Sequence, residues 1–197
     1  DNALFLNLGN GSFTNVTASA GVACTGDFST GAAFADVDGD LDPDLLVDGL
    51  GVGTRLFLND GKGRFTESTK SGLRRNGAAT SLALADLDGD GDLDLYVCQY
   101  RTSSIRGEDQ PPAISARIVD GRAVVTPADR FVGFPRADGT VELAEKGEPD
   151  RLYWNDGKGR FTLASWTQGA FLDEAGQPLK APPEDWGLSF SLRDLNG

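Results

Sequence analysis

The chain has 197 residues, 30 of them acidic and 18 basic, which gives a formal net charge of -12 at pH 7, and it contains no histidine. The missing histidine excludes His-based catalytic triads and His-ligated zinc sites. The acidic excess argues against a nucleic-acid partner, because phosphate contacts need clustered Lys and Arg. No apolar stretch is long enough to cross a bilayer, so no transmembrane segment is expected.

A hairpin signature occurs three times along the chain, at residues 4–14, 56–66 and 152–162. In each copy an apolar run meets an Asn-x-Gly-x-Gly turn, and a second short run containing Phe follows. Asn, Asp and Gly readily adopt the left-handed backbone conformations of a tight turn. Each copy therefore predicts two antiparallel strands.

Two nine-residue segments, 36–44 and 86–94, carry an aspartate at every odd position. Carboxylates packed this closely repel one another unless a cation lies among them, and alternating oxygen ligands suit calcium best. Solvated acidic loops are the alternative, but the same pattern recurs in equivalent surroundings. The candidate metal ligands are Asp36, Asp38, Asp40, Asp42 and Asp44 in the first loop and Asp86, Asp88, Asp90, Asp92 and Asp94 in the second.

These loops do not fit an EF-hand. An EF-hand loop has Gly at its sixth position and Glu at its twelfth, between two helices. Here Gly39 and Gly89 stand at the fourth position, and Val47 and Val97 stand at the twelfth. Without a bidentate Glu the sites are expected to be weak, which favours a compartment where calcium is near millimolar: extracellular, cell surface or periplasmic.

Small residues before each acidic loop and bulky apolar residues after it predict two buried strands joined by that loop. With the hairpin that follows, they form a four-stranded unit of roughly 50 residues, which is typical of a β-propeller blade. We therefore expect an all-β, partial β-propeller over residues 1–197, cut from a larger ring or completed by other fragments or copies. Its predicted parts are 2–17 (end of a blade), 30–69 (a blade), 80–166 (a blade with an insertion at 101–149) and 186–197 (start of a further blade).

The two cysteines leave an alternative open. Cys24 precedes the first strand of one predicted blade and Cys98 ends the second strand of the next. Adjacent blades could bring the sulfurs together in a disulfide, whereas two buried thiols are the ordinary expectation.

The acidic loops and the Leu-x-Asn-x-Gly-x-Gly-x-Phe hairpins resemble the FG-GAP or VCBS repeats of integrin-α-type β-propellers. Within that group the chain is most similar to the cartilage acidic protein (ASPIC/UnbV) type, and especially to its bacterial members. The resemblance implies one structural calcium ion in each complete loop. The ligands would be the carboxylates at the first, third, fifth and ninth positions and the backbone carbonyl of Asp42 or Asp92, and a third loop beginning at Asp194 and Asn196 would be incomplete.

The insertion 101–149 is the best candidate for specific recognition. Strand order places it on the face opposite the acidic loops, and its Asp-Gly pairs predict two small hairpins. Residues that could line a surface for an anionic or carbohydrate partner are Tyr100, Arg101, Phe131, Phe134 and Trp166.

Two functions follow from these features. The first is a calcium-stabilised extracellular scaffold that binds a protein or glycan, with no catalytic residues. The alternative is a carbohydrate-active enzyme of the polysaccharide lyase or glycosidase type, since some calcium-bearing propellers use Lys, Arg or Tyr as a base.

Overall fold

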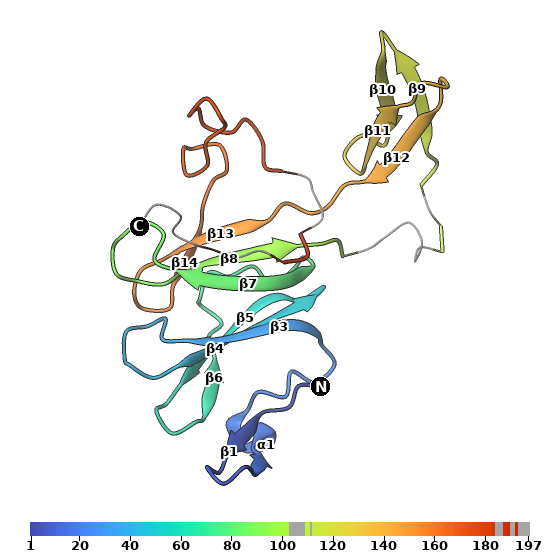
Figure 1. The fold of residues 1–197 in the computed structure, drawn as a ribbon. Coiled ribbons are helices and arrows are strands. Elements are labelled where there is room, and N and C mark those ends of the chain that lie inside the picture. The colour runs from blue at the N-terminus through green and yellow to red at the C-terminus, as the bar shows by residue number, and fades with distance from the viewer. Residues whose placement is uncertain (103–108, 111, 184–186, 190–191, 193–197) are drawn as a thin grey trace.

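The computed structural model describes residues 1–102, 109–110, 112–183, 187–189 and 192. In this part of the chain the only helix is the single turn α1 (Thr17–Ala20), and the remaining elements are strands. Figure 1 shows two four-stranded antiparallel sheets lying beside each other. The predicted fold class, an all-β partial propeller, is confirmed.

The two large sheets share one strand order, in which consecutive strands are neighbours except where the insertion intervenes. In each sheet an acidic loop joins the first two strands, and an Asn-x-Gly-x-Gly turn joins the last two. The first sheet comprises β3 (Phe28–Ala35), β4 (Asp44–Leu50), β5 (Gly53–Asn59) and β6 (Phe65–Glu67). The second comprises β7 (Ala79–Ala85), β8 (Asp94–Gln99), β13 (Arg151–Asn155) and β14 (Phe161–Leu163).

The hairpin at the N-terminal end stands apart from the larger sheets. Its strands, β1 (Phe5–Asn7) and β2 (Phe13–Asn15), pair only with each other in the described part of the chain. It matches the last two strands of the larger sheets in sequence and in register.

The insertion leaves the end of β8 that is remote from the acidic loop, as strand order predicts, and Figure 1 shows it standing away from the two sheets. It forms the two predicted hairpins, which pack on each other: a Cβ on Gly133 would lie 2.6 Å from Val125 Cγ2 and 2.9 Å from Ala123 Cβ. The strands are β9 (Ser115–Val119), β10 (Arg122–Thr126), β11 (Phe131–Pro135) and β12 (Val141–Glu145).

The apolar core lies on both faces of the first sheet. Leu46 of β4 belongs to a cluster that includes Leu95 and Val97 of the second sheet, so this cluster fills the space between the sheets. The neighbouring residues Leu45 and Val47 face the other way, into a cluster with residues around α1. Strand side chains alternate between faces, so the apolar run Leu45–Val47 of β4 is buried on both faces.

A threonine hydrogen bond joins consecutive units along the chain. The hydroxyl of Thr30 donates to the carbonyl of Ala79 at 2.6 Å, and the hydroxyl of Thr80 donates to the carbonyl of Gly187 at 2.8 Å. Gly187 therefore has the same relation to β7 that Ala79 has to β3. The predicted third loop at Asp194 and Asn196 lies outside the described residues.

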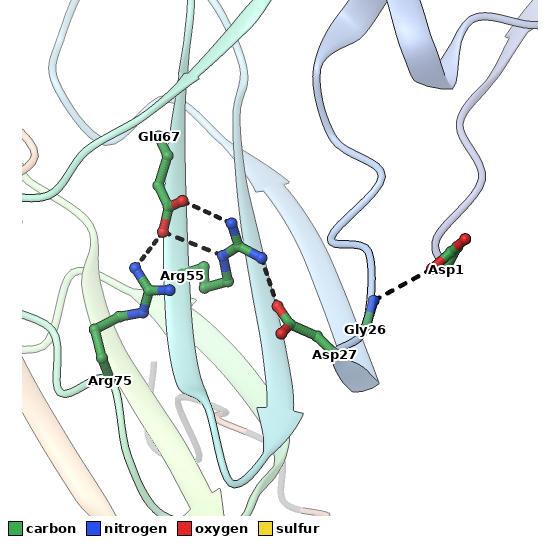
Figure 2. A network of polar contacts seen from close by, with 6 residues as sticks. All are labelled: Asp1, Gly26, Asp27, Arg55, Glu67 and Arg75. Atoms are coloured by element: carbon green, nitrogen blue, oxygen red, sulfur yellow. Dashed lines mark hydrogen bonds and ion pairs between the residues drawn. The ribbon is translucent and has the colours of Figure 1, made fainter.

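A polar network closes the end of the first sheet that is remote from its acidic loop (Figure 2). Arg55 of β5 donates two hydrogen bonds to Glu67 of β6, at 3.1 and 2.6 Å, and a third to Asp27 ahead of β3. Arg75, in the segment that leads to the second sheet, also pairs with Glu67. The Arg55 hydrogen bonds hold the pKa of Glu67 below its usual range.

Candidate metal centres

Each acidic loop joins the first two strands of its own sheet, β3 to β4 or β7 to β8, and folds back on itself. In the first loop Asp36, Asp38 and Asp40 each place one carboxylate oxygen within 4.8 Å of the others. In the second loop Asp86, Asp88 and Asp94 do the same. The structure thus brings together three of the five predicted carboxylates in each loop.

Both loops use the same backbone hydrogen bonds. The first aspartate accepts N–H groups three and five residues later: Asp36 from Gly39 and Leu41, and Asp86 from Gly89 and Gly91, at 2.7 to 3.1 Å. The aspartate at the fifth position, Asp40 or Asp90, accepts a hydrogen bond from the N–H two residues later, at 2.9 Å in each loop. The chain turns sharply at the fourth residue, where Gly39 and Gly89 have φ near +80°, a conformation that glycine adopts without strain.

The aspartate at the ninth position of each loop fixes that loop to its sheet. Asp44 and Asp94 are almost completely buried, and each accepts one N–H from its own loop and one from the hairpin. Asp44 accepts from Val37 at 3.2 Å and from Asn59 at 2.9 Å. Asp94 accepts from Leu87 and Asn155, both at 3.0 Å.

The aspartate at the seventh position, expected to contribute its backbone carbonyl, places its carboxylate on the hairpin turn. A Cβ on Gly61 would lie 2.5 Å from Asp42 Oδ2, so the Asp42 carboxylate rests on the hairpin turn rather than among the clustered oxygens. Asp92 lies against Gly157 in the same way. These turn glycines were not predicted as neighbours of the acidic loops, although each stands two residues after the Asn of its hairpin.

The hairpin Asn residues were also overlooked as parts of the site. Asn59 donates from Nδ2 to the carbonyl of Pro43, and Asn155 donates to Leu93 in the equivalent place. Asn155 donates as well to Val37 of the first acidic loop, at 2.9 Å. The hairpin of the second sheet therefore supports the acidic loops of both sheets.

Burial and mutual repulsion disfavour the ionised carboxylates. Burial, followed by the charges of Asp44 and Asp40, raises the pKa of Asp38. Burial raises the pKa of Asp44, although two backbone hydrogen bonds oppose this effect. Loss of solvation also raises the pKa of Asp88. A divalent cation would reverse this effect, because its charge favours the ionised form of every neighbouring carboxylate.

The residues present fit a hard cation. Asp38 Oδ1 is buried and has no hydrogen-bond partner among the described residues. A buried carboxylate oxygen without a partner is costly, and a cation coordinated by oxygens would satisfy it. The donor set is oxygen only, as calcium requires.

The residues suggested for a partner surface are not gathered on one face. Phe131 and Phe134 lie three positions apart on β11 and so point to opposite sides; Phe131 is buried and Phe134 is 52% exposed. Trp166 stacks on Phe171 with ring centroids 3.8 Å apart, and Arg101 pairs with Glu145. Cys24 and Cys98 are both buried thiols.

Comparisons with known proteins agree with the repeat pattern. No curated protein matches the chain significantly. One similar solved structure is described as the basis of specific recognition of non-reducing terminal N-acetylglucosamine by an Agrocybe aegerita lectin; identity is 20%, and the match covers 93% of this chain and 49% of that one, with a TM-score of 0.28. The chain thus spans about half the length of that structure.

In the described part of the chain, no helix is long and apolar enough to span a membrane.

A family model described as an FG-GAP-like repeat matches residues 1–47 and 51–97. Each match joins a Leu-x-Asn hairpin to the acidic loop that follows it. Over these two segments the chain is therefore similar to FG-GAP-like repeats.

Proposed function

We propose that this chain is part of an extracellular β-propeller scaffold of the cartilage acidic protein (ASPIC/UnbV) type, held together by calcium, which binds a protein or glycan. The observation that carries the proposal is that the backbone hydrogen bonds of the first aspartate repeat in both loops. Three carboxylate oxygens converge in each loop, from positions one, three and five in the first and from positions one, three and nine in the second. Convergence of carboxylates in both loops favours the same kind of bound cation in each loop over two solvated acidic turns.

Calcium would be held by Asp36, Asp38 and Asp40 in the first loop and by Asp86, Asp88 and Asp94 in the second. The ion would supply positive charge to groups that otherwise repel one another. The chain's own contribution is orientation: backbone N–H groups hold the first and ninth carboxylates in place before an ion arrives. We assign the calcium a structural role because both loops join strands of the sheets.

The insertion (residues 101–149) is proposed as the recognition element. It projects from the face opposite the acidic loops and exposes apolar side chains on both of its hairpins, including Ile118, Val124 and Phe134. Arg101 and Arg130 both pair with Glu145 at its base, which supports a fixed arrangement of the two ends of the insertion.

The enzyme alternative gains no support from a cavity beside the insertion that several charged side chains line. This cavity, about 290 Å³, is lined by Glu148, Asp150 and Trp166 among others. Glu148 accepts hydrogen bonds from Thr102 and Ala78, and Asp150 accepts them from Tyr96 and Gln99. Both carboxylates are therefore engaged in structural contacts, and we propose that the chain is not an enzyme.

Calorimetric titration of the metal-free protein with calcium tests the proposal. We expect two ions per chain, one ion in either D36N or D86N, and two ions in the control D120N, which removes a carboxylate from the β9–β10 turn. Uptake of no calcium, or equal uptake by all four proteins, would contradict it. Incubation with a panel of polysaccharides, with and without a chelator, tests the alternative, since turnover would show an enzyme.

A further inference from the structure

Two arginines occupy the same position in the two large sheets but have different partners. Arg55 of β5 and Arg151 of β13 each stand four residues before the Asn of their hairpin turn. Arg55 pairs with Glu67 of the neighbouring strand β6. In the second sheet the residue equivalent to Glu67 is Leu163 of β14. Arg151 therefore lacks the anionic partner that its counterpart has.

The second carboxylate of the network in Figure 2 has no counterpart either, because Asp27 corresponds to Gly77 ahead of β7. The guanidinium of Arg151 lies against this glycine, since a Cβ there would be 2.6 Å from Nη2. Arg151 donates to the backbone carbonyl of Asn76 at 2.7 Å and lowers the pKa of buried Asp48 through its charge. Over the residues that the structure describes, it forms no ion pair with a carboxylate.

A second guanidinium without a partner lines the same cavity. The backbone of Arg74 is held by both sheets: its N–H donates to the hydroxyl of Tyr153, and its carbonyl accepts the N–H of Thr54, both at 3.3 Å. The side chain of Arg74 is exposed and has no hydrogen bond or ion pair within the described ranges. Arg74 and Arg151 both line the cavity of about 290 Å³ at the base of the insertion. This cavity therefore has two cationic groups available to a ligand.

The other walls of the cavity combine apolar surface with a hydrogen-bond acceptor. Leu163 and Trp166 supply apolar surface, and Trp166 is held by the stacked ring of Phe171 and by its indole N–H, which donates to the carbonyl of Asp150 at 3.0 Å. Glu148 accepts three hydrogen bonds, and a carboxylate has about four acceptor sites, so it can accept one more from a ligand hydroxyl. Apolar walls with a few placed polar groups are typical of small-molecule sites.

We propose that this cavity binds a carboxylate-bearing sugar, such as a hexuronate unit of an acidic glycan. Guanidinium groups bind planar carboxylates through paired hydrogen bonds, so the sugar carboxylate lies between Arg74 and Arg151. A ring hydroxyl donates to Glu148, and the ring carbons lie against Trp166. Arg74 also lines an adjoining hollow of about 430 Å³ with Arg75, where the next unit of an acidic chain continues. The inference rests on the proposed function for its glycan partner and names the class of glycan.

The test is calorimetric titration of the whole chain with trigalacturonate and with its methyl ester, which keeps the rings but carries no charge. We expect one site per chain and at least about tenfold weaker binding of the ester. L163E places a carboxylate where the first sheet has Glu67, so it should pair with Arg151 and weaken binding about tenfold. L163Q is similar in size and uncharged, and it should bind like the parent. Leu163 is 36% exposed, so neither variant disturbs the core.

A second pair of variants tests the other guanidinium. R74Q removes an exposed side chain that has no partner in the described structure, so the fold should be retained while trigalacturonate binds about tenfold more weakly. The control R160Q changes an exposed arginine in the hairpin turn at the acidic-loop end of the same sheet and should leave the affinity unchanged.

Absence of trigalacturonate binding would overturn the proposal, and so would equal affinities of L163E and L163Q or of R74Q and R160Q. Equal binding of an Asp-Ala-Asp tripeptide would identify a peptide ligand, and displacement by equimolar acetate would identify a general anion site; either result would overturn it too. Calcium uptake is measured separately on the same protein. Two bound ions without trigalacturonate binding would contradict only this inference, whereas trigalacturonate binding without calcium uptake would contradict only the proposed role of calcium.

Discussion

At the scale of single residues, the aspartates of one loop have different structural roles. Asp44 is buried and accepts two backbone N–H groups, so it holds the strand ends whether or not a cation is bound. Asp40 is exposed, accepts one N–H within the loop and contributes an oxygen to the cluster. Asp42 rests on the hairpin turn. The alternating sequence does not distinguish these three roles, because they depend on which backbone groups come near in the folded chain.

Substitution separates the structural aspartate from the cluster aspartate. D44N puts an amide NH₂ against a backbone N–H, and we expect it to lower the free energy of unfolding by about 1–3 kcal/mol even in a chelator. D40N keeps an amide oxygen for its one hydrogen bond and removes a charge that raises the pKa of Asp38. It should leave metal-free stability unchanged or higher while weakening calcium binding. Urea unfolding with and without calcium measures both, and equal losses in the chelator would contradict these roles.

Asp48 should make stability depend on pH. It is fully buried in β4, accepts a hydrogen bond from Thr54, and burial raises its pKa to about 7, against smaller opposing effects of Thr54 and Arg151. The folded chain therefore keeps a proton that the unfolded chain loses, so this contribution to stability is present below about pH 4 and is lost as the pH rises to about 7.

We expect D48N, which needs no proton, to be more stable than the parent at pH 8 by on the order of 2–4 kcal/mol and similar to it at pH 4. Urea unfolding of both proteins across this pH range measures the difference. A constant difference at all pH values would show that Asp48 does not titrate in this window.

At the scale of elements, the sequence patterns were most informative where one local rule decides the structure. The Asn-x-Gly-x-Gly turns and the strands beside the aspartate loops lie where predicted, because turn chemistry and apolar runs act over a few residues. The helix α1 and the packing of the insertion hairpins at Gly133 were not predicted. Both depend on contacts made only in the folded chain.

The Arg55 network predicts a measurable contribution to the first sheet. R55Q would leave Glu67 and Asp27 without their main partner in a partly buried place, and the free energy of unfolding should fall by about 2 kcal/mol. The control R136Q breaks an exposed ion pair with Glu142 and should change it by less than about 0.5 kcal/mol. Because pairing lowers the pKa of Glu67, the R55Q penalty should shrink as the pH falls and Glu67 becomes protonated. Equal effects of the two variants would contradict this account.

At the scale of the whole molecule, the contact between the sheets was only partly predictable. Internal repetition predicts that consecutive four-stranded units adjoin, but not that Asn155 links them. Its amide donates to Val37 in the first acidic loop and to Leu93 in the second, whereas Asn59 donates only to Pro43 of its own sheet. The two asparagines occupy the same place in their hairpins and are followed by the same seven residues, so the local turn sequence does not distinguish them.

Truncating these two asparagines isolates that link. N155A should cost about 1–3 kcal/mol of unfolding free energy, because it removes two hydrogen bonds made by a buried side chain and leaves the carbonyl of Val37 with only the N–H of Gly159. N59A should cost less, since the two hydrogen bonds of the Asn59 side chain, to the carbonyl of Pro43 and from the N–H of Gly63, are both exposed. The pair is compared by urea denaturation, and a larger loss in N59A would refute the assigned role.

The most direct test of the account is the melting temperature of the metal-free protein against calcium concentration. Two sites filled at about a hundred times their dissociation constants would add about 5 kcal/mol, and the midpoint should rise by roughly 10 °C or more. The combined variant D36N/D86N should show little of this rise. A melting temperature that does not change with calcium would contradict the claim that a cation holds the acidic loops and their strands together.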